Sequence, residues 1–395
     1  MSMYDPNELE HKTSRNRLFF VLCTSIMLCT GLYIALRLFW FNDFSLFVKF
    51  IGISFILVLS QCMFGMRYLV SFTQHMSYTA LKLSGYCSAY FVTLASLIFL
   101  HDVIYFSFCI YFQKLFPYAF SKDFTVLFLI VAFFATIFGA WNALKIPYIF
   151  RRDLFVRNLP KDLQGMKIVH LSDLHIGSTF DEKWLDKLVT KINTEQADLI
   201  VVSGDLVDAT PRKIEKDLEP LRKLKSRLGV HICLGNHEYF CGALPWIEKW
   251  KSWGFYVYIN ENRKFFHNNF PFYIAGSADF EGYKFPGLLT PDLDKTLKDL
   301  DEKDFIILLQ HQPKMARINA KLGIDIQLSG HTHGGQYFFL FPIVHILNRG
   351  FRNGFYQVGD MSLYVSPGSG LWGYVPLRFG TRSEVIVHKL VSYEK

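Results

Sequence analysis

Four long apolar runs in the first 150 residues constrain the fold of this chain most strongly. Each run reaches the roughly 20 residues that a helix needs to cross the hydrocarbon core of a bilayer. Backbone that is buried in lipid must satisfy its own hydrogen bonds, so the runs predict transmembrane helices. We expect these spans at residues 18–40, 44–64, 85–111 and 124–144.

The first run is compatible with a secretory signal peptide as well as with a retained helix. It is long for a signal sequence, it lacks a small-residue cleavage site, and further apolar runs follow it. These features favour the retained helix. Three ionisable residues, Lys49, His101 and Asp102, lie in or near the spans. We expect Lys49 to reach the interface from a helix end, and His101-Asp102 to mark a break or kink in the third span.

Flanking charges predict the orientation of the spans. Residues 1–157 hold 13 Lys and Arg against 7 Asp and Glu, so +6 of the net charge of +8 belongs to the membrane half. Basic residues gather before the first span, in the second loop and after the last span, which places both termini in the cytoplasm. We therefore expect a multi-pass protein of the cell inner (plasma) membrane with a cytoplasmic second half. This distribution does not favour nucleic-acid binding.

The seven cysteines include no CxxC pair, and five of them lie in apolar stretches. We infer a reducing compartment and no structural disulfide.

The second half of the chain alternates short apolar strands with amphipathic helices, which is typical of an α/β fold. Helices are expected at residues 182–196 and 211–228, the latter interrupted at Pro220. Predicted strands cover residues 167–171, 197–202, 230–234, 254–259, 272–275, 305–309, 324–329, 363–365 and 385–390.

Polar side chains that bind metal ions follow five of these strands. Sites in open α/β sheets form beyond the carboxyl ends of strands, so we expect the five segments to converge. Their candidate residues are Asp173, His175, Asp205, Asn236, His237, Glu238, His311, His331 and His333.

Imidazole nitrogens mixed with carboxylate and amide oxygens suit Mn, Fe or Zn better than Ca. The ligands are too many for one tetrahedral zinc and suit two divalent ions with a shared carboxylate. A single Asp after a strand is usually a turn or cap residue, and a lone His-x-His pair is weak evidence. The combination of so many ligand types, each after an apolar strand, favours a dinuclear metal site that activates water.

The motifs Asp-x-His, Gly-Asp, Gly-Asn-His-Glu, a lone His and Gly-His-Thr-His resemble those of the calcineurin-like metallophosphoesterase superfamily. The resemblance covers the chain from about Lys161 onward. Together with the apolar runs, it predicts a transmembrane helical domain at 1–150 followed by an α/β domain at 151–395. For the α/β domain the resemblance implies two stacked β-sheets flanked by helices. It also implies a first ion held by Asp173, His175 and His333. A second ion would be held by Asn236, His311 and His331.

The same resemblance gives roles to three further residues. Asp205 would bridge the two ions, His237 would protonate the leaving oxygen or bind the phosphoryl group, and Glu238 would orient or charge-balance His237. The segments Ser172–Gly177, Gly330–Gln336 and Pro376–Gly380 are similar to the membrane-associated bacterial phosphodiesterase branch. Some relatives in that branch act on membrane lipids, including enzymes that cleave UDP-2,3-diacylglucosamine.

Residues 337–347 are strongly apolar and follow the last ligands directly, so they form either a lip for an acyl chain or a buried strand. Arg349, Arg352, Arg378 and Arg382 are candidates for phosphate contacts, although a solvated surface position is favoured for each.

The sequence thus predicts a membrane-tethered, metal-dependent phosphoesterase that hydrolyses phosphodiester or pyrophosphate bonds in a lipid-linked substrate, with membrane lipids as partners. The alternatives are an anchored phosphatase of soluble phosphoesters and a non-catalytic membrane sensor or transporter with a metal-binding domain. The chain contains no P-loop, HExxH or Gly-x-Ser-x-Gly motif to support NTPase, zinc-protease or serine-hydrolase chemistry.

Overall fold

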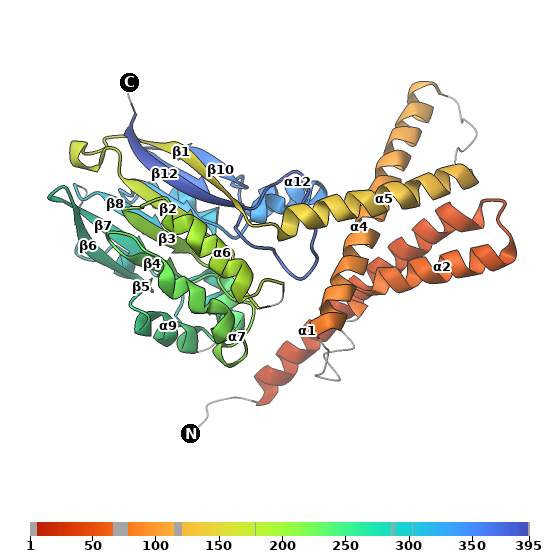
Figure 1. The fold of residues 1–395 in the computed structure, drawn as a ribbon, viewed down its shortest axis with the longest axis horizontal. Helices are drawn as coiled ribbons and strands as arrows, with labels where there is room; N and C mark the ends of the chain where they lie inside the picture. The colour runs from red at the N-terminus through yellow and green to blue at the C-terminus, as the bar shows by residue number, and fades with distance from the viewer. Residues whose placement is uncertain are drawn as a thin grey trace. The chain divides into compact units, whose positions relative to one another are not determined.

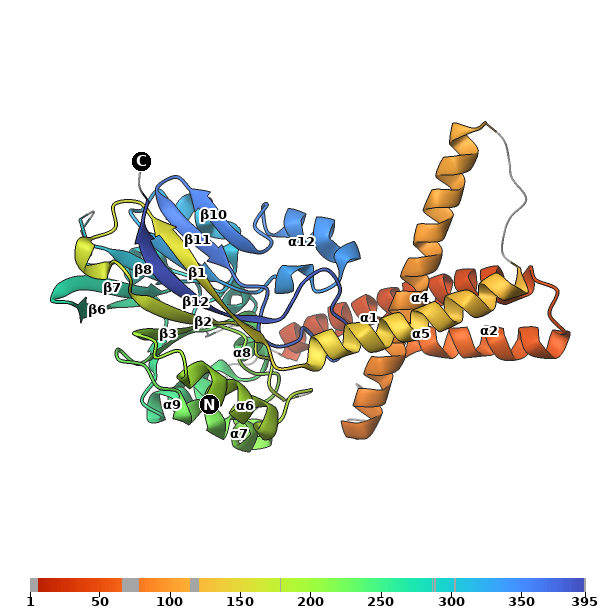
Figure 2. The ribbon, with the colours of Figure 1, turned by 45° about the horizontal axis from the view of Figure 1, so that its top comes forward.

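The computed structural model describes residues 6–65, 78–113, 121–177, 179–285, 287, 289–301 and 303–393. Residue contacts divide the chain into two compact units (Figures 1 and 2). The helical unit comprises Met1–Trp141 with Tyr374–Leu377, and the α/β unit comprises Asn142–Gly373 with Arg378–Lys395. The first strand of the α/β unit begins at Tyr148, and the predicted domain boundary at residue 150 stays a prediction.

Apolar helices build the helical unit. Ile34, Ile56 and Leu94 are fully buried between three of them. The first helix ends in a π-helical turn, η1. The elements are α1 (Pro6–Ala35), η1 (Leu36–Trp40), α2 (Leu46–Gln61), α4 (Tyr78–Tyr111) and α5 (Lys122–Leu144).

Three described helical segments are long and apolar enough to cross a membrane: Phe20–Trp40, Thr79–Tyr111 and Lys122–Leu144. They cover the first, third and fourth predicted spans. The second predicted span falls on α2, which has 16 residues. At 1.5 Å per residue α2 is about 24 Å long, less than the roughly 30 Å of a hydrocarbon core. The count of four crossings therefore stays a prediction.

The expected break at His101-Asp102 is wrong, because α4 runs continuously from Tyr78 to Tyr111. Asp102 is buried and is stabilised from α1 and η1: Arg37 Nη2 lies 2.5 Å from its Oδ1, and the Tyr33 hydroxyl donates to its Oδ2. A paired carboxylate can remain inside an apolar helix, so no break is needed. Lys49 donates from Nζ to the Trp40 carbonyl at 2.9 Å.

Two six-stranded sheets form the α/β unit, and each contains four consecutive parallel strands. The strand order of the first sheet is β1 (Tyr148–Val156), β12 (Glu384–Ser392), β2 (Lys167–Leu171), β3 (Leu199–Ser203), β4 (Val230–Cys233) and β5 (Tyr256–Tyr258). The order of the second sheet is β10 (Gly354–Val358), β11 (Met361–Val365), β9 (Ile326–Ser329), β8 (Ile306–Leu309), β7 (Phe270–Gly276) and β6 (Glu261–His267).

The core of this unit lies between the sheets and on their outer faces. Ile168 and Val201 from the first sheet share one buried cluster with Ile274 and Ile307 from the second, so the sheets stack face to face. Side chains of alternate residues point to opposite faces of a strand, and Val169 accordingly packs on the outer face against the helices. Figure 2 shows α6, α7 and α9 on that side of β2 and β3.

Local signals explain where the helices begin. Asp181 caps α6 by accepting a hydrogen bond from the Trp184 backbone N–H at 2.9 Å, and Pro211 occupies the first turn of α7. The helices are α6 (Glu182–Asn193), α7 (Pro211–Leu218), α8 (Asn236–Phe240), α9 (Ala243–Ser252), α10 (Leu293–Thr296), α11 (Ala316–Asn319) and α12 (Phe341–Leu347). The 3₁₀ turns are η2 (Lys161–Leu163), η3 (Glu219–Lys223), η4 (Phe280–Lys284), η5 (Pro313–Met315), η6 (His333–Gly335) and η7 (Phe338–Leu340).

All nine predicted strands are confirmed, with small shifts at their ends, and the predicted helices appear as α6 and α7. Pro220 lies in η3 directly after α7, as the predicted interruption requires. The prediction missed β1, β6 and β10. These strands lie at sheet edges and are mostly half-buried or exposed, so they lack the continuous apolar pattern of a central strand. All seven cysteines are free.

Candidate metal centre

The five candidate segments converge where the parallel strands end. Asp173 and His175 follow β2, Asp205 follows β3, Asn236 begins α8 after β4, His311 follows β8, and His331 and His333 follow β9. The loops after β2 and β3 are tied together, because the Asp173 N–H donates to the Gly204 carbonyl at 3.0 Å. The His331 N–H donates to both carboxylate oxygens of Asp173 at 3.1 Å and joins the second sheet to the first.

Five of these residues have a left-handed backbone, which side-chain-bearing residues rarely adopt. Such conformations cost about 1–3 kcal/mol each and persist at sites where the surrounding contacts enforce them. The φ angles are 53° at Asp173, 48° at His175, 54° at Asp205, 71° at His331 and 48° at His333.

Two glycines allow the neighbouring ligands to approach closely. A Cβ atom at Gly330 would overlap the Asp173 carboxylate and the Ser172 hydroxyl. A Cβ atom at Gly235 would overlap the Asp205 carboxylate. The glycines in Gly-His-Thr-His and Gly-Asn-His-Glu are therefore required by packing against carboxylates from other segments.

Asp173, His175 and His333 form the first ligand group, and all three side chains are buried. The His333 Nε2 atom lies 3.3 Å from Asp173 Oδ1 and 3.1 Å from His175 Nε2. The third pair, His175 Nε2 and Asp173 Oδ1, is 3.9 Å apart. The three ligand atoms thus lie within 3.9 Å of one another.

Asp205, His311 and His331 form the second group, and the Asn236 amide lies among them. His311 Nε2 is 3.1 Å from Asp205 Oδ2 and 3.2 Å from Asn236 Oδ1. His331 Nδ1 is 2.9 Å from the same amide oxygen. Asp205 Oδ2 is also 3.7 Å from His175 Nε2 of the first group, so this carboxylate lies between the two groups.

These distances fit divalent metal ions. Ligand atoms bound at about 2.0–2.2 Å lie about 2.8–3.6 Å apart in octahedral or tetrahedral geometry, and within the two groups only the 3.9 Å between His175 Nε2 and Asp173 Oδ1 exceeds this range. In two of the histidines, hydrogen bonds at Nδ1 leave Nε2 available to bind a metal ion. The Nδ1 atoms of His175 and His311 are bonded to Asp208 Oδ1 and to the Ser203 carbonyl, each at 2.7 Å. Each ring therefore presents Nε2 as the ligand atom, as is usual for metal-binding histidines.

The charge states agree with this arrangement. Burial lowers the pKa of His331 to about 3 and that of His333 to about 4, so both imidazoles are neutral near pH 7. Burial by itself raises the pKa of Asp173, but the adjacent His333 outweighs it and holds the pKa of this carboxyl below its usual range. Burial also acts on His175 and His311, but the carboxylates of Asp208 and Asp205 outweigh it and raise the pKa of these two imidazoles. The site thus combines two neutral imidazoles with an ionised carboxylate, and a bound metal ion would displace the protons of the other two imidazoles.

Sequence reasoning missed Asp208, which lies three residues after Asp205 in the same loop. Its Oδ1 atom accepts from Nδ1 of both His175 and His237 at 2.7 Å. Burial lowers the pKa of His237, but the carboxylates of Asp205 and Asp208 outweigh it and raise this pKa to about 9. The recurrence of Asp at 205 and 208 was the available signal, although an Asp in a loop is more often a turn residue.

Glu238 does not bond to the imidazole of His237. Its carboxylate accepts from the backbone N–H groups of Gly235 at 2.7 Å, Asp205 at 3.0 Å and Leu206 at 2.7 Å. Glu238 thereby holds together the loops that follow β3 and β4. The carboxylate that orients the His237 ring is that of Asp208, and a catalytic role for Glu238 stays a prediction.

The expected surface position of Arg378 is wrong. This side chain is fully buried, and its Nη2 donates to the Gly370 carbonyl at 2.7 Å and to the Pro367 carbonyl at 3.0 Å. Arg378 lies directly behind His333, since its Nη2 is 3.4 Å from His333 Nδ1. It therefore supports a ligand loop rather than facing solvent.

Of the two alternatives for residues 337–347, a lip for an acyl chain and a buried strand, the buried strand is wrong. The segment forms η7 and α12, and several of its apolar side chains are exposed. Close by, the Trp372 ring stacks on His333 with centroids 6.3 Å apart and is 49% exposed. Apolar surface therefore begins next to the ligands.

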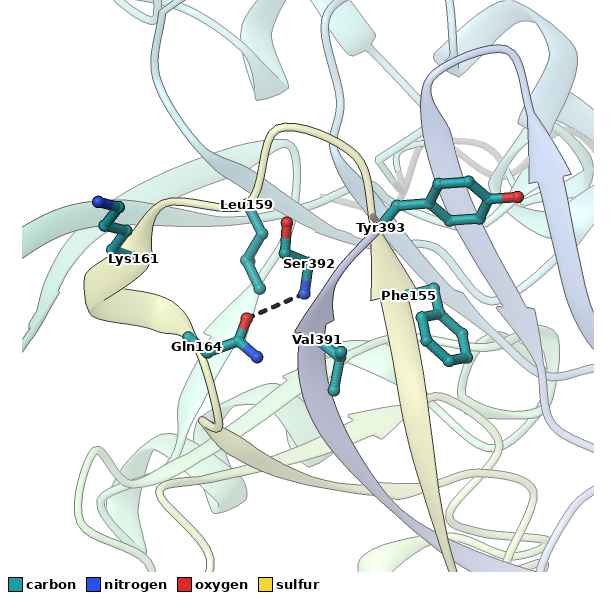
Figure 3. Close-up of a pocket in the computed structure, with 7 residues that line it drawn as sticks. All are labelled: Phe155, Leu159, Lys161, Gln164, Val391, Ser392 and Tyr393. Atoms are coloured by element: carbon teal, nitrogen blue, oxygen red, sulfur yellow. Dashed lines mark hydrogen bonds between the residues drawn. The ribbon is translucent and has the colours of Figure 1, made fainter. Parts of the chain in front are cut away.

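A hollow of about 880 Å³ lies elsewhere in the α/β unit (Figure 3). Its lining residues are Phe155, Leu159, Lys161, Gln164, Val391, Ser392 and Tyr393. They belong to the ends of β1 and β12 and the turn after β1. Because β12 runs antiparallel to β2, this end of the sheet is opposite the one that carries Asp173. The hollow is not part of the metal centre.

Comparison with known proteins agrees with the geometry. The sequence model of the family described as Calcineurin-like phosphoesterase matches residues 166–335. An uncharacterized metallophosphoesterase of Aquifex aeolicus is 31% identical over 262 residues, which cover 65% of this chain and 97% of that protein. The chain therefore belongs to the calcineurin-like metallophosphoesterases, a family of metal-dependent phosphoesterases.

Two further relatives are larger than the matched region. An uncharacterized metallophosphoesterase of Campylobacter jejuni is 39% identical over 252 residues, covering 63% of this chain and 64% of that protein. A protein of Danio rerio named as a transmembrane protein with a metallophosphoesterase domain is 34% identical over 270 residues, which cover 66% of this chain and 61% of that protein. The match thus spans less than two thirds of the length of these two relatives.

Proposed function

We propose that this chain is a membrane-tethered phosphoesterase that uses two divalent metal ions to hydrolyse phosphodiester or pyrophosphate bonds in a lipid-linked substrate. The observation that carries the proposal is the position of Asp205 Oδ2, which lies 3.1 Å from His311 Nε2 and 3.7 Å from His175 Nε2. One carboxylate oxygen between two imidazole-containing groups suits a dinuclear centre. Mn, Fe and Zn share this ligand preference.

In this proposal Asp173, His175 and His333 hold one ion, Asn236, His311 and His331 hold the other, and Asp205 bridges them. Such a pair activates water and stabilises the oxygens that attack and leave phosphorus. The buried carboxylates and the neutral imidazoles of His331 and His333 support these assignments.

His237 is the proposed catalytic residue that acts on the leaving oxygen. Its backbone N–H donates to Asp205 Oδ1 at 2.8 Å, which fixes the residue at the centre. Its side chain remains 20% exposed and is accessible to a substrate. With a pKa of about 9, the imidazole holds a proton near neutral pH and can donate it as the ester bond breaks.

Apolar surface beside the ligands supports a lipid-linked substrate. The exposed Trp372 ring stacks on His333, and Phe338 is 42% exposed on the segment that follows the ligands. A phosphoryl group at the metal centre would place an attached acyl chain within reach of these rings.

Turnover of a generic phosphodiester by the purified full chain with Mn²⁺ tests the catalytic roles. We expect Asp205→Asn and His237→Ala each to reduce turnover at least 100-fold, which is a typical loss for general acid–base groups. Metal content of both variants separates the two roles, because His237→Ala leaves the proposed ligands intact. Wild-type turnover in both variants, or a wild-type protein without bound metal, would refute the proposal.

Membrane lipid extracts incubated with the active chain test the substrate class. We expect mass spectrometry to show loss of a phosphate-linked lipid with wild-type protein and no loss with Asp205→Asn. Unchanged lipids, together with intact turnover of soluble phosphoesters, would favour an anchored phosphatase of soluble substrates.

We also propose that the α/β unit faces the cytoplasm from the plasma membrane. Basic residues after α5 (Lys145, Arg151 and Arg152) support this orientation. Protease added to sealed vesicles should cleave the α/β unit in inside-out preparations only. Cleavage in right-side-out vesicles would reverse the assignment.

A further inference from the structure

The segment that follows the metal ligands contains no Asp, Glu, Lys or Arg from Phe338 to Leu347, and its one ionisable side chain is His345. It forms η7 and α12, a short apolar helical segment at the surface of the α/β unit. Surface helices normally carry charged residues on their outer face, because that face meets water. The apolar character of the outer face of α12 therefore indicates that this face meets something other than water.

One face of α12 fixes the helix to the α/β unit. A Cβ atom at Gly335 or at Gly380 would overlap the Phe341 ring, so both glycines lie directly against that ring. The Arg352 guanidinium lies 3.9 Å from the centroid of the Phe341 ring. Arg352 also donates to the carbonyl of Gly334 at 2.7 Å, within the loop that carries His333. Through Phe341 and Arg352, α12 thus packs directly against the loop that carries His333.

The opposite face is apolar and exposed. Ile343, Ile346 and Leu347 are spaced as neighbours on one side of a helix and are 54%, 74% and 70% exposed. Phe338 adds a fourth exposed apolar side chain. Single exposed apolar residues are ordinary, but several contiguous ones indicate an interaction surface.

Basic side chains lie at the end of this face. Arg349 is exposed directly after α12, and Arg317 donates to its carbonyl from Nη1 at 2.7 Å. Arg317 also lies over the Phe351 ring at 4.8 Å and is exposed. Arginines beside an apolar helix face suit anionic phosphates at the level of lipid headgroups.

A short connection keeps the α/β unit near a helix that is long enough to cross a membrane. The segment Lys122–Leu144 is long and apolar enough to cross a membrane, and β1 begins at Tyr148. Only residues 145–147 separate the two elements, and a fully extended connection of that length spans about 14 Å. A tether this short gives the α/β unit a high effective concentration at the membrane surface.

We propose that α12 inserts its exposed face into the bilayer, with Ile343, Ile346 and Leu347 among the acyl chains and Arg317 and Arg349 at the headgroups. The helix is then a membrane-docking surface of the α/β unit. Because Arg352 and Phe341 connect it to the ligand loop, its insertion also sets the height of the metal centre above the membrane. Docking itself does not depend on the proposed activity.

Photolabelling of the full chain tests this proposal. The chain is reconstituted in vesicles of phosphatidylcholine and phosphatidylglycerol that carry a diazirine at the end of an acyl chain. After irradiation, mass spectrometry of tryptic peptides should locate lipid adducts within residues 338–349. The peptide Phe265–Lys284 is a matched control, because it contains Phe266, which is 57% exposed on the β6–β7 hairpin. It should remain unlabelled.

Substitution of exposed residues on the outer face of α12 provides a second test of membrane docking. Ile346→Asp with Leu347→Asp should reduce adducts in residues 338–349 at least about tenfold, since it removes two aliphatic side chains that would enter the bilayer. Phe266→Asp should leave them unchanged. Hydrolysis of a soluble phosphodiester and metal content should equal those of the wild type in both variants, which separates a failure of docking from a failure of the proposed function.

Absence of adducts in residues 338–349 of the wild type, while Lys122–Leu144 is labelled, would overturn the proposal. Equal labelling in the Ile346→Asp, Leu347→Asp variant would also overturn it. Chemical cross-links between two copies at α12 in place of lipid adducts would assign the face to self-association instead.

Discussion

Replacement of Asp208 by Asn tests the position of two histidines with one substitution. The Asp208 Oδ1 atom accepts from Nδ1 of His175 and of His237, each at 2.7 Å, and the side chain is only 12% exposed. Asparagine has nearly the same shape and retains an acceptor oxygen. The substitution therefore removes the charge and little else.

The expected loss follows from these two hydrogen bonds. A bond to a charged group contributes about 1.5–3 kcal/mol, against about 0.5–1.5 kcal/mol between neutral groups. Losing the charge on both bonds thus costs about 2 kcal/mol, which corresponds to a fall of about 30-fold in turnover or metal affinity. This agrees with the 10- to 100-fold effect typical of groups that orient metal-bound histidines.

The assay is turnover of a phosphodiester across a Mn²⁺ titration, with metal content measured in parallel. If Asp208 acts through His175, excess Mn²⁺ restores turnover in the variant. If it acts through His237, excess Mn²⁺ does not restore turnover, and the loss is larger for substrates with poor leaving groups. The exposed Asp294 in the first turn of α10 provides a control substitution, Asp294→Asn. Wild-type turnover and metal affinity in Asp208→Asn would refute the positioning role.

The remaining predictions concern packing, pH and metal binding. Gly235→Ala places a Cβ atom against the Asp205 carboxylate, so we expect bound metal to fall at least about tenfold while β4 stays folded; full metal content would contradict this. Burial lowers the pKa of His231 to about 3, so the unfolded chain binds more protons below pH 6.5 and stability falls as pH decreases. At pH 5 the buried His231 should lower the free energy of unfolding by about 2 kcal/mol. The His231→Gln variant should therefore show a smaller fall in melting temperature between pH 7 and pH 5 than the wild type. Removal of divalent ions with EDTA should lower the melting temperature of the wild type, because ions that bind only the folded state stabilise it; about 2.7 kcal/mol is expected at 100 times the dissociation constant. The same treatment should have a much smaller effect on Asp205→Asn.

Local patterns account for the parts of the structure that could be predicted. The hydropathy of three spans depends only on adjacent residues and on the thickness of a bilayer, and these spans are present as long apolar helices. The α/β pattern is equally local, because central strands such as β3 (Leu199–Ser203) are buried on both faces and read as continuous apolar runs.

Non-local contacts account for the errors. Asp102 remains in an unbroken helix because Arg37, 65 residues away, supplies the opposite charge. Arg378 is buried because two backbone carbonyls and His333 surround its guanidinium. Residues 338–347 are as apolar as a core strand, and only their packing through Phe341 determines that one face stays outside.

By itself, the sequence determined that the chain has apolar helices followed by an α/β domain, and which residue types follow each strand. Hydropathy, periodicity and ligand chemistry are properties of neighbouring residues, so no coordinates are needed to recognise them. Only the tertiary structure decided that Asp208 joins His175 to His237, that Glu238 binds backbone amides, and that α12 exposes an apolar face. These features arise where distant segments meet, and the distances between such segments are not encoded in any local pattern.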